Sequence, residues 1–159
     1  MKVKLPTSKD VVAARKRIGD HVDVTPIFSS VVLDDIAGAN LLIKAECLQG
    51  TGSFKLRGAT NRLLQIPKKK RENGVVAFSS GNHAQGVAWA AKRLGISAVI
   101  VMPRDAPRVK LENTKSLGAE VEIALARLAA IAPGVLSVRD GVRIDSGKIN
   151  ATVGLPRTP

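Results

Sequence analysis

The chain of 159 residues has the length of one domain with enough apolar content for a hydrophobic core, and a second full domain would not fit. Its formal net charge is +12, but the only dense cationic run is at residues 68–71, and the chain has three phenylalanines, one tryptophan and no tyrosine. We therefore expect that run to form a solvated loop, and we do not expect nucleic-acid binding through stacked aromatic rings.

Metal sites and membrane segments are also not expected. Cys47 is the only cysteine, which excludes an intramolecular disulfide and a cysteine-based metal cluster. His21 and His83 lie far apart with no carboxylate at metal-ligand spacing, so we expect no bound metal. No apolar run approaches the roughly 18 residues of a membrane-spanning helix. A cytoplasmic protein without signal peptide or membrane anchor is the expectation.

The first part of the chain predicts short elements separated by breakers. Ser8 is a candidate N-cap for an amphipathic helix that ends at Gly19. A second short helix is expected to start at Ser29 or Ser30 and to stop at Gly38. A strand at residues 41–45 and a turn at residues 49–52 follow.

Residues 53–65 predict a helix that Ser53 caps and that stops before Pro67. Its residues Phe54, Ala59 and Leu63 are expected to pack inward. Lys55 then lies in the first helical turn, where a cation is disfavoured by about 0.3–1 kcal/mol. A lysine in that position is not there for stability, which favours a reactive amine, although a surface lysine of a helix is the commoner case.

Strand and helix patterns alternate in residues 75–123. The expected strands are residues 75–78, 98–102 and 119–123, and the expected helices are residues 82–94 and 106–117. This alternation with short connections predicts an α/β fold with a parallel sheet and flanking helices. In such sheets ligands bind beyond the carboxyl ends of the strands.

One such end carries the loop Ser79-Ser80-Gly81-Asn82-His83-Ala84-Gln85-Gly86. Its small residues lead into a helix whose first N–H groups lack helical acceptors and bind anions readily. The same pattern also suits a tight turn in which serine and asparagine act only as caps. His83 is either a proton carrier or a locally packed side chain. An amine beside an anion site would indicate imine chemistry on a small anionic carbonyl compound.

The segment Thr51-Gly52-Ser53-Phe54-Lys55-Leu56-Arg57-Gly58-Ala59 and the loop at residues 79–86 resemble the serine/threonine dehydratase family of pyridoxal-phosphate enzymes. Members of that family share the fold of the tryptophan synthase beta chain. The resemblance covers roughly residues 10–123 and is closest to threonine ammonia-lyases and their relatives, which include serine racemases and 3-hydroxyaspartate dehydratases. It implies pyridoxal 5'-phosphate as the cofactor and the N-terminal part of the tryptophan synthase beta-like fold.

The resemblance also implies roles for residues that contact the cofactor. Lys55 would hold the cofactor as an imine and would move the alpha proton of the substrate. Phe54 would lie against the cofactor ring, and Asn82 would hydrogen-bond the 3-hydroxyl of the cofactor.

Substrate contacts follow from the same resemblance. Ser79, Ser80, Gly81 and His83 would surround the substrate carboxylate. Ser80 also matches the acid/base that racemising relatives use on the opposite face. The implied reaction removes the alpha proton, eliminates the beta hydroxyl and hydrolyses the resulting enamine to a 2-oxo acid and ammonia, with the cofactor as electron sink.

The resemblance weakens after Ile123. Family members continue with a glycine-rich loop for the cofactor phosphate, whereas no run of consecutive glycines follows Gly118 here. We therefore expect a truncated family member with a partial catalytic domain at residues 1–123. We expect residues 124–159 to be a divergent tail, either disordered or translated from a shifted frame, and we expect a short helix at residues 124–131. Poor cofactor affinity is expected, and the exposed sheet edge is expected to favour association or instability.

Two functions stay open. The first is pyridoxal-phosphate-dependent deamination of a hydroxy amino acid, threonine or serine, to a 2-oxo acid and ammonia. The second is a non-catalytic α/β fragment that keeps the motifs by descent and binds anions or nucleic acid weakly through its basic surface.

Overall fold

The computed structural model describes residues 5–124, 136–138, 143–145 and 148–150. The helices are α1 Ser8–Ile18, α2 Val31–Ala37, α3 Lys55–Leu64, α4 Lys68–Arg71, α5 Asn82–Leu94 and α6 Arg108–Ser116, with 3-10 turns η1 Gly19–His21 and η2 Glu46–Leu48. The strands are β1 Ile27–Phe28, β2 Ile43–Lys44, β3 Val75–Phe78, β4 Ala98–Pro103, β5 Glu120–Ala124, β6 Leu136–Val138, β7 Arg143–Asp145 and β8 Lys148–Asn150.

The central sheet has the strand order β5-β4-β3-β6. Strands β3, β4 and β5 run parallel, with Val75 opposite Ala98 and Val99 opposite Glu120. Helices α5 and α6 are the crossovers between these strands, and they pack on β3 and β4 and on β5 respectively. The predicted α/β fold class, a parallel sheet with flanking helices, is therefore confirmed. Strand β6, which pairs antiparallel with β3, was not expected.

The hydrophobic core lies between the sheet and the helices α3 and α5. Apolar side chains that are almost fully buried come from all three layers, namely Leu56, Leu63, Val75, Val87, Ile100 and Met102. An uninterrupted apolar run is typical of a strand inside a parallel sheet, and β4 is buried along its whole length. This core supports the carboxyl ends of β3 and β4, from which the loop at residues 79–82 and the helix α6 start.

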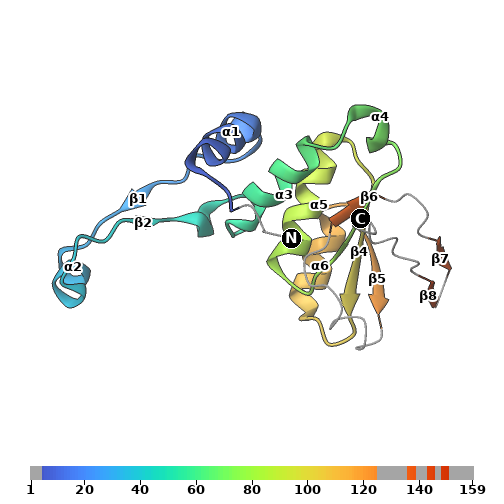
Figure 1. Cartoon of the computed structure of the whole chain (residues 1–159). Coiled ribbons are helices and arrows are strands. Elements are labelled where there is room, and N and C mark those ends of the chain that lie inside the picture. The colour runs from blue at the N-terminus through green and yellow to red at the C-terminus, as the bar shows by residue number, and fades with distance from the viewer. Residues whose placement is uncertain (1–4, 125–135, 139–142, 146–147, 151–159) are drawn as a thin grey trace.

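The N-terminal residues form an arm outside this core. Strands β1 and β2 pair antiparallel, lead away from the sheet and carry α2 at their far end (Figure 1). The arm exposes apolar side chains, among them Val24 at 95%, Ile36 at 78% and Leu42 at 74%. The strand predicted at residues 41–45 is limited to β2, and β1 is too short to give a sequence pattern.

Two predicted details of the helices are wrong. Helix α1 is capped by Thr7 rather than Ser8, because Thr7 and Asp10 exchange side-chain hydrogen bonds with each other's backbone N–H. The cationic run at residues 68–71 forms the helix α4 rather than a loop, and Arg71, half-buried at its end, donates hydrogen bonds back to the carbonyl oxygens of Leu64 and Ile66.

The helix predicted at residues 124–131 lies outside the described residues, apart from Ala124, which ends β5. The division of the chain into residues 1–123 and residues 124–159 stays a prediction. Within the ranges that the structure describes, no helix has the length and apolar character needed to cross a bilayer.

Candidate active site

The lysine segment and the small-residue loop meet where α3 packs against α5. A Cβ atom on Gly86 would lie 3.2 Å from the carbonyl carbon and oxygen of Lys55 and 3.3 Å from the backbone nitrogen of Leu56. Helix backbones can approach this closely only where a side chain is absent, which explains the glycine. Gly86 therefore places the start of α3 alongside α5, and the two motifs share one edge of the fold.

Lys55 is the first residue of α3 and is exposed. Its Nζ atom lies 5.1 Å from the centroid of the Phe54 ring. The expectation that Phe54 packs inward is wrong, because its side chain is 59% exposed. Phe54 precedes the helix with helical backbone angles, and this geometry directs its ring outward beside the amine. Both side chains are therefore accessible from solvent at the same place.

Ser53 does not cap α3 as predicted. Phe54 is the N-cap, and the carbonyl oxygen of Ser53, not its hydroxyl, accepts the N–H of Leu56 at 3.5 Å. The Ser53 side chain is buried, and within the described residues neither its Oγ atom nor the Oγ1 atom of Thr51 has a hydrogen-bond partner. Buried hydroxyls without a partner are costly, so two such groups just before Lys55 mark a place where a polar ligand would satisfy them.

The turn before Lys55 also packs against α5. A Cβ atom on Gly50 would lie 2.8 Å from the ring of Trp89. The indole Nε1 atom of Trp89 is buried and lacks a partner among the described residues. Helix α5 thus supports this turn through Trp89 and supports the start of α3 through Gly86.

The loop after β3 leaves N–H groups unpaired at the start of α5. Ser79 donates its N–H to Val101 at 3.1 Å, and Gly81 donates its N–H to Oγ of Ser79 at 3.3 Å. In contrast, no acceptor in the described part of the chain binds the N–H groups of Ser80, Asn82, His83 or Ala84. Ser80 and Asn82 are exposed, whereas Ser79 and His83 are half-buried. The unpaired donors at this helix start favour an anion, as the loop sequence predicts.

His83 lies on the same side of α5 as Gly86, one turn earlier, and the charge of Lys55 affects its pKa. Burial lowers the pKa of His83 below its ordinary value of 6.5, and the positive charge of Lys55 lowers it further. The Nε2 atom of His83 is buried, with no hydrogen-bond partner in the described ranges. Burial and the charge of Lys55 thus both disfavour the protonated form of this imidazole.

Replacing Lys55 by methionine should raise the pKa of His83 but leave it below 6.5, because burial persists when the charge is removed. As pH falls, His83 in the unfolded chain is protonated at a higher pH than His83 in the folded chain. The free energy of unfolding should therefore fall as pH drops below 6.5. Imidazole chemical shifts measured against pH check the first point. Lys92→Met, at an exposed position of α5, is the control, and an unchanged His83 titration in Lys55→Met would contradict the placement.

A further charged residue at this edge is absent from the sequence-based prediction. Lys110, in the first turn of α6, donates from Nζ to Oδ1 of Asn82 at 2.7 Å and to Oε1 of Gln85 at 3.3 Å. The segments that follow neighbouring parallel strands meet at one edge of a sheet. The segment after β4 therefore carries the signal that would have indicated Lys110.

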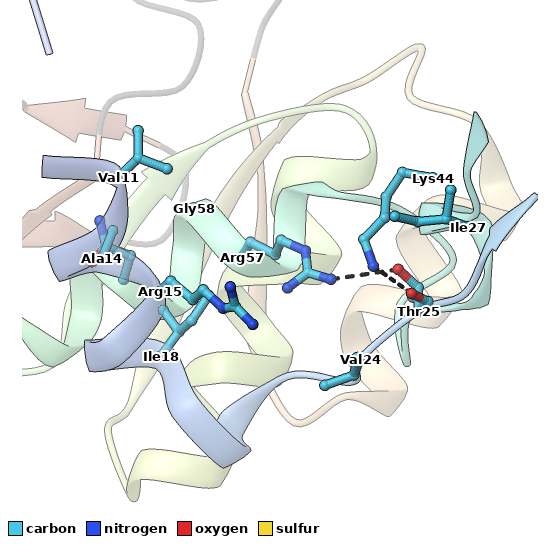
Figure 2. Close-up of a pocket in the computed structure, with 11 residues that line it drawn as sticks. Val11, Ala14, Arg15, Ile18, Val24, Thr25, Ile27, Lys44, Arg57 and Gly58 are labelled. Carbon is cyan, nitrogen blue, oxygen red and sulfur yellow. Dashed lines mark hydrogen bonds between the residues drawn. The ribbon is translucent and has the colours of Figure 1, made fainter. Parts of the chain in front are cut away.

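A separate hollow of about 670 Å³ lies between α1, α3 and the base of the arm (Figure 2). Gly58 lines it, but Lys55 and the loop at residues 79–82 do not. Two of the cations that line it are engaged within the protein: Arg57 binds both carboxylate oxygens of Glu46 at 2.8 Å, and Lys44 donates to the carbonyl oxygen of Thr25. Hydrogen bonds from Arg57 lower the pKa of Glu46 to about 2. This network joins the arm to α3.

Comparison with known proteins matches residues 18–143 to a family described as "Pyridoxal-phosphate dependent enzyme". The L-threo-3-hydroxyaspartate ammonia-lyase of a Pseudomonas species is 50% identical over 119 residues, which cover 75% of this chain and 37% of that protein. The L-threonine ammonia-lyase of Thermotoga maritima is 47% identical over 115 residues, covering 72% of this chain and 29% of that protein. The structure of maize serine racemase superposes with a TM-score of 0.70 and 44% identity, covering 73% of this chain and 35% of that one.

The chain thus spans less than two fifths of the length of these relatives. Both alignments to the curated relatives include about three quarters of the chain, and the family match extends past Ile123. The superposition agrees with the predicted N-terminal part of the tryptophan synthase beta-like fold.

Proposed function

Because this chain belongs to the pyridoxal-phosphate dependent enzyme family, we propose that it carries the amine-bearing part of a site that deaminates a hydroxy amino acid, threonine or serine, to a 2-oxo acid and ammonia. The observation that carries the proposal is the close approach at Gly86, which brings Lys55 to the start of α5 with its unpaired N–H groups. The relatives support this reaction class, since their names include ammonia-lyases for threonine and for 3-hydroxyaspartate.

The family depends on pyridoxal phosphate, and the residues present fit part of that cofactor. The exposed amine of Lys55 suits its aldehyde, and the buried Ser53 Oγ atom, which lacks a partner among the described residues, suits one of its polar groups. We assign Asn82 as the hydrogen-bond partner of the 3-hydroxyl of the cofactor, and Phe54 as the side chain that lies against the cofactor ring. When bound, the cofactor supplies an electron sink for the carbanion.

The residues of this chain account for binding and for proton movement. Unpaired N–H groups at the start of α5 bind the substrate carboxylate together with Ser79, Ser80, Gly81 and His83. Lys55 removes and returns the alpha proton through Nζ, and the Ser80 hydroxyl serves the opposite face. The pKa of His83 is lowered by burial and by Lys55, which disfavours a second positive charge beside the amine.

This sequence offers fewer partners for the phosphate of the cofactor than the family pattern does. The sequence contains no run of consecutive glycines after Gly118, where the resemblance calls for a phosphate-binding loop. Each missing charge-assisted hydrogen bond costs about 1.5–3 kcal/mol of binding free energy. We therefore expect cofactor to bind to this chain weakly, and we assign deamination to a site that includes the rest of the family fold.

The proposal predicts a specific covalent link at Lys55. Purified chain mixed with pyridoxal phosphate should gain a new absorbance band, and borohydride should fix the cofactor onto the peptide that contains Lys55. Lys55→Arg should abolish that adduct, whereas Lys68→Arg, at an exposed position of α4, should leave it in place. Mass spectrometry of the digested protein measures both. Adducts spread evenly over surface lysines and unaffected by Lys55→Arg would instead favour the non-catalytic fragment.

A further inference from the structure

The ammonium group of Lys110 holds two amide side chains of α5. Its Nζ atom lies 2.7 Å from Oδ1 of Asn82 and 3.3 Å from Oε1 of Gln85. Asn82 and Gln85 are three residues apart, so both face α6 from the same side of α5. Gln85 is only 4% exposed, whereas Asn82 is exposed. Lys110 is therefore anchored at the buried amide and reaches the exposed one.

The chemistry of the two groups decides how the Asn82 amide is turned. A lysine ammonium has three donors and no acceptor, and a primary amide has an oxygen at one end and an NH2 group at the other. Lys110 therefore binds the oxygen, and the NH2 group of Asn82 faces away from α6. Among the described residues no other group bonds to the Asn82 side chain, so Lys110 alone sets this orientation.

The charge of Lys110 is not neutralised by a carboxylate. The ion pairs within the described ranges join Arg57 to Glu46 and Arg108 to Glu112 and do not involve Lys110. A cation is unfavourable at the start of a helix, so this position does not stabilise α5. The ammonium polarises the amide that it binds, which strengthens the NH2 group as a donor.

We propose that Lys110 is a positioning residue that turns the Asn82 amide so that its NH2 group, rather than its oxygen, faces the ligand. A ring oxygen that is anionic or shared with a proton needs a donor at that point, and an amide oxygen would repel it. The inference rests on the proposed function, which assigns Asn82 to the 3-hydroxyl of the cofactor. Lys110 acts through Asn82 and does not itself take part in the reaction.

The contact can be tested in the full chain without cofactor. The side-chain amide signals of Asn82 in nitrogen-15 spectra should shift in Lys110→Met and should stay close to the wild-type position in Lys110→Arg. Lys115→Met changes an exposed lysine at the other end of α6 and is the matched control. Unchanged Asn82 signals in Lys110→Met would overturn the inference whether or not the chain binds cofactor.

The consequence for the ligand is measured by titration with pyridoxal phosphate, followed by absorbance. Lys110→Met should weaken binding about tenfold, in keeping with the loss of an oriented hydrogen bond, and Lys110→Arg should restore most of it. In an Asn82→Ala background Lys110→Met should have no further effect. Equal losses with and without Asn82 would overturn the positioning role but not the proposed function. A wild-type chain that binds no cofactor would overturn the proposed function and this role together, and the Asn82 signals would then report the contact alone.

Discussion

Replacing Gly86 by alanine is expected to destabilise the protein by about 1–3 kcal/mol, although alanine is the better helix former. The added Cβ would lie 3.2 Å from the Lys55 carbonyl group, and a backbone cannot yield as the end of a flexible side chain can. Helix α3 must therefore move away from α5, and this movement increases the distance between Lys55 and the first turn of α5. Urea unfolding measures the loss of stability, and the borohydride-fixed adduct on Lys55 should decrease with it.

Gly58→Ala is the matched control for this experiment. Gly58 is also a helical glycine, but apart from its chain neighbours and the nearby backbone of its own helix, no described atom lies within 4 Å of a Cβ built on it. Alanine there should stabilise α3 by up to about 1 kcal/mol. If the two substitutions changed the free energy of unfolding by similar amounts, the close approach at Gly86 would not determine how the helices pack.

Truncating Leu63 to alanine should cost about 2–5 kcal/mol of stability, because its side chain is fully buried between α3, α5 and the sheet. The cavity left behind adds to the lost transfer free energy. Leu64→Ala removes the same atoms from a half-buried position next along the helix and should cost less than half as much. Far-ultraviolet circular dichroism in increasing urea measures both. Equal losses would show that α3 does not belong to the core.

Sequence patterns predict β3 and α5 with the bounds that the structure has. The run Val75–Phe78 is uninterrupted and apolar, and Gly95 closes α5 in a left-handed conformation with φ at 66°. Both signals are local, so neighbouring residues suffice to determine them. The parallel sheet then follows from the alternation of elements.

Details that depend on contacts outside the local window were not predicted. Four consecutive cations do not reveal that Arg71, at the end of α4, hydrogen-bonds back to the carbonyl oxygens of Leu64 and Ile66. Ser53 matches the preference for an N-cap, but the preceding turn buries its side chain and shifts the cap to Phe54. Propensity describes what a residue favours, and packing decides which of those options is taken.

In the candidate site, too, local patterns predict some residues, and others depend on contacts between distant segments. Lys55 and the loop at residues 79–86 are recognisable because each is a contiguous pattern. Lys110 follows Asn82 by 28 residues, and only the crossover from β3 through α5 and β4 brings it back to the same edge. The lowered pKa of His83 likewise depends on burial by the packed fold and on Lys55, which belongs to another helix.

The packing of Trp89 against Gly50 gives this protein an internal optical probe. The chain contains one tryptophan, and its ring contacts the turn that precedes Lys55 from the helix that carries the small-residue loop. Indole emission responds to the polarity and the chromophores around it, so its intensity should follow any displacement of that turn. Occupancy of the Lys55 edge can then be measured by fluorescence quenching, without an added label or a catalytic assay.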